Sequence, residues 1–384
     1  MTELLETPYG TQDFLPKEAA AKRVVEQKIF ALFTSFGYEE VVTPTMEYLE
    51  TLTTSSGRAQ EPHLFKMFDR NNRTLALRHE MTTPIARLAV SRLKDSPMPL
   101  KLSYNTNVFR FRTNQPGRQC EFYQAGVELL GISNAFADAE IIALAAQALN
   151  VAGLKDFKIC LGQVEFAGGL MENLSAELQT EIKSAIERHD IVALNNLPVD
   201  DSLKKIPTLQ GGKEILTAAQ AIADNERSRK ALSNLAEIYR LLEIYGVADK
   251  ITFDLGLIRD FEYYTGMVFE AYSHGVGYSL AGGGRYDNML KDFGAACPAT
   301  GFALGIERIL DARKFQDIAE DLSVKNFYLS YSAGQEYAAI KKAAELRAAG
   351  KVVEVSLIPQ NKSEAKKSCA EKNCSELIYL VNVN

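Results

Sequence analysis

The sequence of 384 residues predicts an α+β protein, in which a β-rich domain carries a helical insertion and is followed by a small α/β domain. Strand-like segments at residues 100–111 and 119–130 flank the polar loop TNQPGR, which predicts a long β-hairpin. Residues 167–250 are charged and helical in pattern, and strand-like segments resume after them, which indicates an insertion. After about residue 324 the pattern alternates as β-α-β-α-β, which is typical of largely parallel strands.

The β-rich domain begins with a predicted helix at residues 17–36. Apolar side chains recur there every three to four residues, and Pro16 and Gly37 stand where helices commonly start and end. The apolar stripe consists of Val24, Val25, Ile29, Leu32 and Phe33. The segment YEEVVTP then predicts a strand that Pro44 ends.

The remaining elements of this domain follow the same two periodicities. Helices are predicted at 83–93 and 138–151, and strands at 64–77 (with a turn), 157–161, 251–255, 264–272 and 278–281. The last element is a predicted helix at 301–313. Gly301 and Gly305 are four residues apart, so they would share the face of a helix that packs closely on the sheet.

The composition predicts a folded cytoplasmic protein. Hydrophobic residues make up 46% of the chain, and the net charge of −6 argues against nucleic acid as the main partner, because phosphate contacts need a surplus of Lys and Arg. Neither a signal peptide nor a membrane span is predicted. The cysteines, Cys120, Cys160, Cys297, Cys369 and Cys374, are odd in number and scattered, which predicts reduced structural thiols. The spacing of Cys369 and Cys374 fits no zinc site, and no metal is predicted.

The predicted hairpin carries residues suited to ligand binding. The arginines near its turn are Arg110, Arg112 and Arg118, and arginine binds phosphate or carboxylate groups through paired hydrogen bonds. On the returning strand, a period of two puts Gln124, Gly126 and Glu128 on one face, where the small residue leaves room for a ligand. A solvated hairpin with loop arginines is the alternative, and the hairpin alone does not decide between them.

Further candidate residues lie in three later segments. LIRDFEYYTG holds Arg259, Tyr263 and Tyr264, and adjacent strand residues face opposite ways, so at most one tyrosine would line a given pocket. The run AGGGRYD at residues 281–287 allows close approach of the backbone to a ligand, and GFALGIER presents Arg308. Taken singly, these segments equally fit a packed aromatic pair, a tight turn and a packed helix.

The order and spacing of these segments resemble the class II aminoacyl-tRNA synthetases and, among them, histidyl-tRNA synthetase. YGTQDFLP looks like that family's opening segment, FGYEEVVTPTME is similar to motif 1, the hairpin to motif 2 and GFALGIERI to motif 3. IRDFEYYTG and AGGGRYD resemble two signatures peculiar to the histidyl enzyme. The resemblance covers nearly the whole chain. It implies an antiparallel sheet flanked by helices at residues 1–322, and a dimer through motif 1.

The resemblance also implies a histidine-binding site. The residues implied for the amino group are Glu80, Thr82 and Gln124, and those for the imidazole are Glu128 and Tyr264, with Tyr263 nearby. A carboxylate and a phenol suit a ring that both donates and accepts hydrogen bonds. Arg259 matches an arginine that stabilises the reacting carboxylate and α-phosphate, and Arg110 and Arg308 match two phosphate-binding arginines.

The motif 2 stretch departs from the synthetases. Their Phe-Arg is followed by an aromatic residue, Glu and Arg, whereas Arg112 and Thr113 occupy the last two positions here, and a later basic residue is Cys120. An arginine cannot accept the hydrogen bond of the adenine amino group that the glutamate accepts, a penalty of about 1–3 kcal/mol. These changes predict a chain with no catalytic residues, in which Arg110 and Arg308 are vestigial.

Other segments resemble the regulatory subunits of ATP phosphoribosyltransferase. RHEMT, with Met81 in place of a glycine, RDFEYYTGMVFEAY and the triple-glycine run all follow that version. The resemblance implies a cofactor-free role in the first step of histidine biosynthesis, in a hetero-octamer with a short catalytic subunit that is a glycosyltransferase, and in histidine feedback. Residues 325–384 resemble a truncated anticodon-binding domain, but acidic residues balance their lysines and no RNA surface is predicted.

Two other functions remain open on the sequence alone. An active histidyl-tRNA synthetase would need ATP and tRNA, and histidine-dependent pyrophosphate exchange would support it. A synthetase-like amino-acid sensor would act on some other partner, which copurification would identify.

Overall fold

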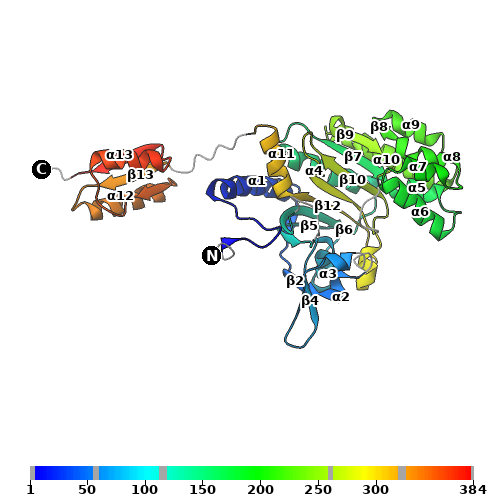
Figure 1. Ribbon diagram of the computed structural model, residues 1–384, viewed down its shortest axis with the longest axis horizontal. Helices are drawn as coiled ribbons and strands as arrows, with labels where there is room; N and C mark the ends of the chain where they lie inside the picture. The colour runs from blue at the N-terminus through cyan, green and yellow to red at the C-terminus, as the bar shows by residue number, and fades with distance from the viewer. Residues whose placement is uncertain (1–4, 55–59, 112–118, 258–262, 319–325, 382–384) are drawn as a thin grey trace. The chain divides into compact units, whose positions relative to one another are not determined.

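The computed structural model describes residues 5–54, 60–111, 119–257, 263–318 and 326–381 (Figure 1). The chain forms two compact units, Met1–Ala319 and Glu320–Asn384. Each unit has a hydrophobic core of its own.

The larger unit is built on a mainly antiparallel sheet. Within the described residues the sheet has nine strands in the order β1-β5-β6-β12-β11-β10-β7-β9-β8. Their bounds are β1 Glu39–Glu40, β5 Leu100–Phe109, β6 Glu121–Leu130, β7 Lys158–Gln163, β8 Gln210–Gly211, β9 Ile251–Asp254, β10 Met267–Tyr272, β11 Ala281–Arg285 and β12 Ala299–Gly305. All pairs from β5 across to β7 are antiparallel, which confirms the predicted sheet, while β1–β5 and β7–β9 are parallel pairs nearer its edges.

Three helices pack together on one face of this sheet: α1 (Pro16–Ser35), α4 (Ala135–Val151) and α11 (Ile306–Phe315) (Figure 1). The predicted stripe of α1 is buried at Val25, Ile29 and Phe33, and the Phe33 ring meets Phe302 of β12 edge-on, with 5.8 Å between centroids. Helix α4 begins three residues before its predicted start, because the Asn134 side chain accepts a hydrogen bond from the Ala137 N–H and caps the helix.

The opposite face of the sheet carries α3 (Thr82–Arg92) and the 3-10 helix η5 (Met289–Phe293), packed in a second core. That core includes Met81, Ile85, Leu102, Tyr104 and Tyr286. Beside α3 lie α2 (Leu49–Leu52) and a small sheet made of β2 (Met46–Tyr48), β4 (Thr74–Leu77) and β3 (Lys66–Phe68). Thr82, at the N-terminal end of α3, hydrogen-bonds to Glu128 of β6, so this end of the helix lies against the large sheet.

The predicted insertion is helical, apart from β8, and gathers at one end of the sheet beside β8 and β9 (Figure 1). Its helices are α5 Val164–Leu170, α6 Ala176–Glu187, α7 Ile191–Asn196, α8 Asp201–Lys205, η3 Ile206–Thr208, α9 Glu214–Gln220, α10 Glu226–Ile244 and η4 Ala248–Lys250. Five of them begin at a polar side chain that accepts a backbone hydrogen bond, namely Gln163, Ser175, Asp190, Asp200 and Asn225. The chain enters this segment from β7 and returns to the sheet at β9.

The prediction of one helix over residues 301–313 is wrong at its N-terminal half. Residues 301–305 belong to strand β12, and α11 begins only at Ile306. The two glycines lie in the sheet and not on a helix face, because Gly301 is paired with Glu128 and Gly305 with Gln124 of β6. Small residues allow close packing in a central strand as well as on a helix face. The spacing of the glycines alone therefore could not distinguish a strand from a helix.

The smaller unit confirms the predicted β-α-β-α-β order. Its elements are β13 Phe327–Tyr331, α12 Glu336–Ala348, β14 Val353–Val355, α13 Lys362–Glu371 and β15 Glu376–Leu380. The three strands are parallel, in the order β14-β13-β15. Across the described ranges of both units, no helix is long and apolar enough to cross a membrane.

Candidate functional site

A cavity of about 410 Å³ lies where β6, β11 and β12 meet the N-terminal end of α3. Every predicted site residue in the described part of the chain lines this cavity: Glu80, Thr82, Arg110, Gln124, Glu128, Tyr263, Tyr264 and Arg308. Arg259 lies outside the described residues, as do Arg112, Thr113 and Arg118. The fold thus brings together segments that are more than 200 positions apart in the sequence.

The strand register explains how β6 presents its polar side chains. Gln124 and Glu128 face the cavity, as the period of two predicts, while Ala125 and Val127 between them are buried in the core under the helices. Gly301 lies opposite Glu128, and a Cβ at that position would be 1.9 Å from Glu128 Oε2. Glycine is therefore required here for the carboxyl group to occupy its place.

Glu128 lies deep in the cavity, with 1% of its surface exposed. Thr82 Oγ1 donates a hydrogen bond to Glu128 Oε1 at 2.9 Å, and the Tyr286 hydroxyl donates to Oε2. Burial raises the pKa of Glu128 to about 8, although both hydrogen bonds act in the opposite direction. A carboxyl group that exchanges its proton near neutral pH can pair with an imidazole either as acceptor or as donor.

Glu80 and Gln124 supply acceptors in the same cavity. The Glu80 carboxylate accepts hydrogen bonds from the N–H groups of Thr82 at 2.6 Å and Thr83 at 2.9 Å, and so caps α3. Gln124 Oε1 is buried and, among the described residues, has no hydrogen-bond partner. An unpartnered buried acceptor costs about 1–3 kcal/mol, so this oxygen fits a ligand that donates, such as an ammonium group.

Tyrosines form one wall of the cavity. The ring centroid of Tyr263 lies 4.7 Å from that of Tyr264 and 5.7 Å from that of Tyr286. The expectation that only one of Tyr263 and Tyr264 would line a pocket is wrong, because both do. The alternation rule does not apply, since β10 starts only at Met267 and the two residues precede it in non-strand backbone.

The two predicted phosphate-binding arginines also line the cavity. Arg110 Nε donates to the His79 carbonyl at 2.8 Å, and its guanidinium lies 5.2 Å from the centroid of the Phe122 ring. Arg308 Nη1 donates to the Ser279 carbonyl at 2.6 Å, and its guanidinium lies 5.3 Å from the Tyr278 ring. Both guanidinium groups are therefore held by main-chain carbonyl groups of this chain.

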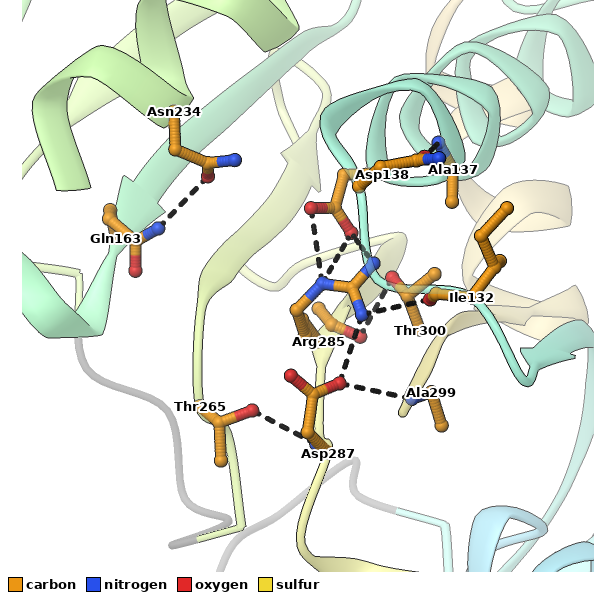
Figure 2. Close-up of polar contacts among 12 residues, drawn as sticks. Ile132, Ala137, Asp138, Gln163, Asn234, Thr265, Arg285, Asp287, Ala299 and Thr300 are labelled. Carbon is orange, nitrogen blue, oxygen red and sulfur yellow. Dashed lines mark hydrogen bonds and ion pairs between the residues drawn. The ribbon is translucent and has the colours of Figure 1, made fainter. Parts of the chain in front are cut away.

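A buried ion pair fixes the end of β11, which Tyr286 directly follows. Arg285 Nε donates to Asp138 Oδ1 at 3.0 Å, and Arg285 Nη1 donates to Asp287 Oδ1 at 2.9 Å and to the Ile132 carbonyl at 3.2 Å (Figure 2). Arg285 and Asp138 are 6% and 1% exposed, respectively. Tyr286 follows Arg285 directly, and its hydroxyl donates to Glu128, so anchoring Arg285 under α4 helps to position the Tyr286 side chain.

Several cavity residues were not predicted from the sequence. Tyr286 adjoins the glycine run, so its place next to that motif was an available signal. Tyr104 and Phe122 lie on hairpin strands, with the same parity as Leu102 and Gln124, but nothing in their spacing distinguished a cavity wall from a core. Within the described ranges, no group of three or more His, Cys, Asp or Glu side chains could hold a metal ion.

Comparison with known proteins also finds histidyl-tRNA synthetases and ATP phosphoribosyltransferase regulatory subunits. Residues 10–309 match the family model described as histidyl-tRNA synthetase. An ATP phosphoribosyltransferase regulatory subunit from Moorella thermoacetica is 42% identical over 380 residues, which cover 96% of each chain. A protein of the same name from Acetivibrio thermocellus is 35% identical, with 98% of this chain and 92% of that one covered.

Solved structures of these two kinds of protein also match this chain. The crystal structure of an ATP phosphoribosyltransferase regulatory subunit/histidyl-tRNA synthetase from Bacillus halodurans matches with a TM-score of 0.86 at 32% identity, covering 99% of both chains. A histidyl-tRNA synthetase from Nostoc matches with a TM-score of 0.84, covering 98% of this chain and 91% of that one, but at 20% identity it shows likeness of fold alone. With relatives above 30% identity along nearly its whole length, this chain belongs to the histidyl-tRNA synthetase-like family of ATP phosphoribosyltransferase regulatory subunits.

Proposed function

We propose that this chain is a non-catalytic regulatory subunit that activates a short-form ATP phosphoribosyltransferase catalytic subunit in the cytoplasm and binds histidine as the feedback signal. The observation that carries this proposal is the match to regulatory subunits along 96% of the chain. The assembly proposed is a hetero-octamer in which this chain also pairs with itself, without a metal or cofactor of its own. Nucleic acid is not part of the proposal, given the net charge of −6.

The cavity supports histidine as the ligand. The unpartnered Gln124 Oε1 suits the ammonium group, with the carboxylate of Glu80 nearby. Glu128 and the Tyr264 hydroxyl suit the two imidazole nitrogens, one of which accepts and the other donates in the neutral ring. Histidine then regulates the partner to the extent that it binds one conformation of the assembly more tightly than another.

The motif 2 sequence supports the absence of catalysis. Arg110 Nε and Arg308 Nη1 donate to the carbonyl groups of His79 and Ser279, which ties each side chain to the cavity wall. Arg112 stands where the resembling synthetases carry the glutamate that reads adenine. We propose that both guanidinium groups now stabilise the cavity walls.

Reconstitution with a short-form catalytic subunit from the same source tests the regulatory role. Phosphoribosyl-ATP formation should rise several-fold only when both chains are present, and the two should co-elute. Histidine should then slow the assembled enzyme but not the catalytic subunit alone. If the chains neither co-elute nor affect the rate, and this chain instead catalyses histidine-dependent pyrophosphate exchange, the synthetase function replaces the one proposed.

The pH dependence of the free energy of unfolding should show whether Glu128 keeps its proton in the folded chain. Burial raises its pKa from 4.5 to about 8, so the folded chain keeps a proton that the unfolded chain releases between these values. The stabilising contribution is complete below about pH 4.5 and is lost as the pH rises to about 8, with a slope of up to about 1.4 kcal/mol per pH unit.

Urea unfolding of the wild type and Glu128→Gln between about pH 5 and pH 8 measures this slope. Glu307, whose pKa burial raises to about 7, contributes a slope of the same sign in both chains, so the difference between the two chains is the informative quantity. Equal slopes in both chains would mean that Glu128 is already ionised in the folded state.

A further inference from the structure

The C-terminal end of α13 brings two cysteines together. The helix ends at Glu371, and Asn373 follows in the left-handed conformation with φ of 52°. The Cys374 N–H donates to the Cys369 carbonyl at 3.0 Å, and the Asn373 N–H donates to the Ala370 carbonyl at 3.1 Å. This pair of bonds defines a Schellman cap, a motif in which the side chains at the positions of Cys369 and Cys374 are commonly neighbours.

The main-chain geometry allows a covalent bond between the two sulfur atoms. A main-chain N···O distance of 3.0 Å, with standard bond lengths, holds the two Cα atoms within about 7 Å of each other. Disulfides join Cα atoms about 4.4–6.8 Å apart. In the reduced chain Cys369 Sγ lies 3.6 Å from the Cys374 carbonyl oxygen and Cys374 Sγ lies 3.9 Å from the Lys372 carbonyl oxygen, so both side chains must turn about their Cα–Cβ bonds for the sulfur atoms to join.

We propose that Cys369 and Cys374 form a reversible disulfide, which makes the end of α13 a thiol-redox site of this protein. The site lies in the smaller unit and stands independently of the histidine cavity. Sequence spacing alone indicated neither a zinc site nor a bridge, because five residues along an extended chain would separate the thiols. The helical turn and its cap bring them together.

The two thiols differ in the way that a redox pair requires. Cys374 is half-buried and accessible, whereas Cys369 is 8% exposed and burial raises the pKa of its thiol. Solvent access favours Cys374 as the thiol that attacks first.

The reaction uses a small-molecule disulfide such as oxidised glutathione. The Cys374 thiolate attacks one sulfur of the oxidant, whose S–S bond breaks and releases one glutathione thiolate. Cys369 then loses its proton and attacks the Cys374 sulfur, displacing the second glutathione. The two protein thiols lose two electrons, the oxidant becomes two glutathione molecules, and these take up the two protons. A reducing cytoplasm returns the pair to thiols.

Equilibration of the full chain with glutathione mixtures tests the proposal. After the remaining thiols are alkylated, mass spectrometry should find residues 369 and 374 joined within one chain, while Cys160 is alkylated at the same glutathione ratio. The equilibrium constant for closure should be at least about tenfold larger in the folded chain than in urea, because the cap preorganises the thiols. Separate glutathione adducts, links between chains, or equal constants would overturn the proposal.

Substitution of the cap residue supplies the matched control. Asn373→Gly introduces a residue that adopts positive φ readily, so the equilibrium constant for disulfide closure should stay nearly unchanged. Asn373→Val disfavours that conformation by about 1–2 kcal/mol and should lower the constant about tenfold. Equal constants for the two variants would mean that the cap does not bring the thiols together. If the valine variant fails to fold, the glycine variant and the comparison in urea still decide the matter.

Discussion

Replacing Asp138 with alanine is expected to lower the free energy of unfolding of the larger unit by about 3–5 kcal/mol. Arg285 would keep its charge under α4 but lose the carboxylate that both its Nε and Nη2 contact, at 3.0 and 2.8 Å. Asp287, whose side chain is 31% exposed, would be left as its acidic partner. Urea unfolding followed by circular dichroism gives the change from the midpoint and slope.

Two comparisons separate the buried pair from a general effect of losing charge. Glu226→Ala removes the exposed contact with Lys230 in α10 and should leave the unfolding midpoint unchanged. The double variant Asp138→Leu with Arg285→Met should recover much of the loss, because no unpaired charge remains buried. If Asp138→Ala unfolds like the wild type, Asp287 and the Ile132 carbonyl are sufficient partners for Arg285.

Gly301→Ala is expected to weaken histidine binding by about 100-fold, or about 2.7 kcal/mol. A Cβ at this position would lie 1.9 Å from Glu128 Oε2 and 2.5 Å from the Val127 carbonyl oxygen. Since Val127 belongs to the neighbouring strand, the carboxyl group must move and lose its contacts with Thr82 and Tyr286. Calorimetry on the isolated chain measures the loss.

The matched control is Gly277→Ala. Gly277 also lines the cavity, but a Cβ there would meet no atom within 4 Å, so the affinity should stay at the wild-type value. An affinity of Gly301→Ala equal to that of the control would place the ligand away from Glu128. If the wild-type chain itself binds no histidine, the ligand proposed for the cavity is wrong, although the regulatory role could still be tested by reconstitution.

The parts of this structure that the sequence predicts are those with local patterns. The alternation of Gln124, Gly126 and Glu128 predicts which side chains of β6 share a face, and the order of elements in the smaller unit follows from its periodicity. Helix bounds are less certain because caps decide them. Asn134 starts α4 earlier than the apolar pattern indicates.

Contacts that depend on assembly of the whole sheet were not predictable from one chain. Asp138 and Arg285 are 147 positions apart, and each alone resembles an ordinary surface charge. The sequence predicts a helix at residues 301–305. The Glu128 carboxyl group on the neighbouring strand requires glycine at position 301, and this requirement is apparent only when the strand register is known. The cavity residues were predicted from the resemblance to a family, because their spacing in the sequence does not indicate that they lie together.

Strand β6 has a consequence for insertions and deletions. Its even-numbered residues, Gln124 and Glu128 among them, face the cavity, and its odd-numbered residues, such as Ala125 and Val127, face the core under the helices. A deletion of one residue between Gln124 and Glu128 would exchange the two faces on one side of the deletion, and either Gln124 or Glu128 would then point into the apolar core. The length of this strand is therefore under a stricter constraint than most of its individual side chains.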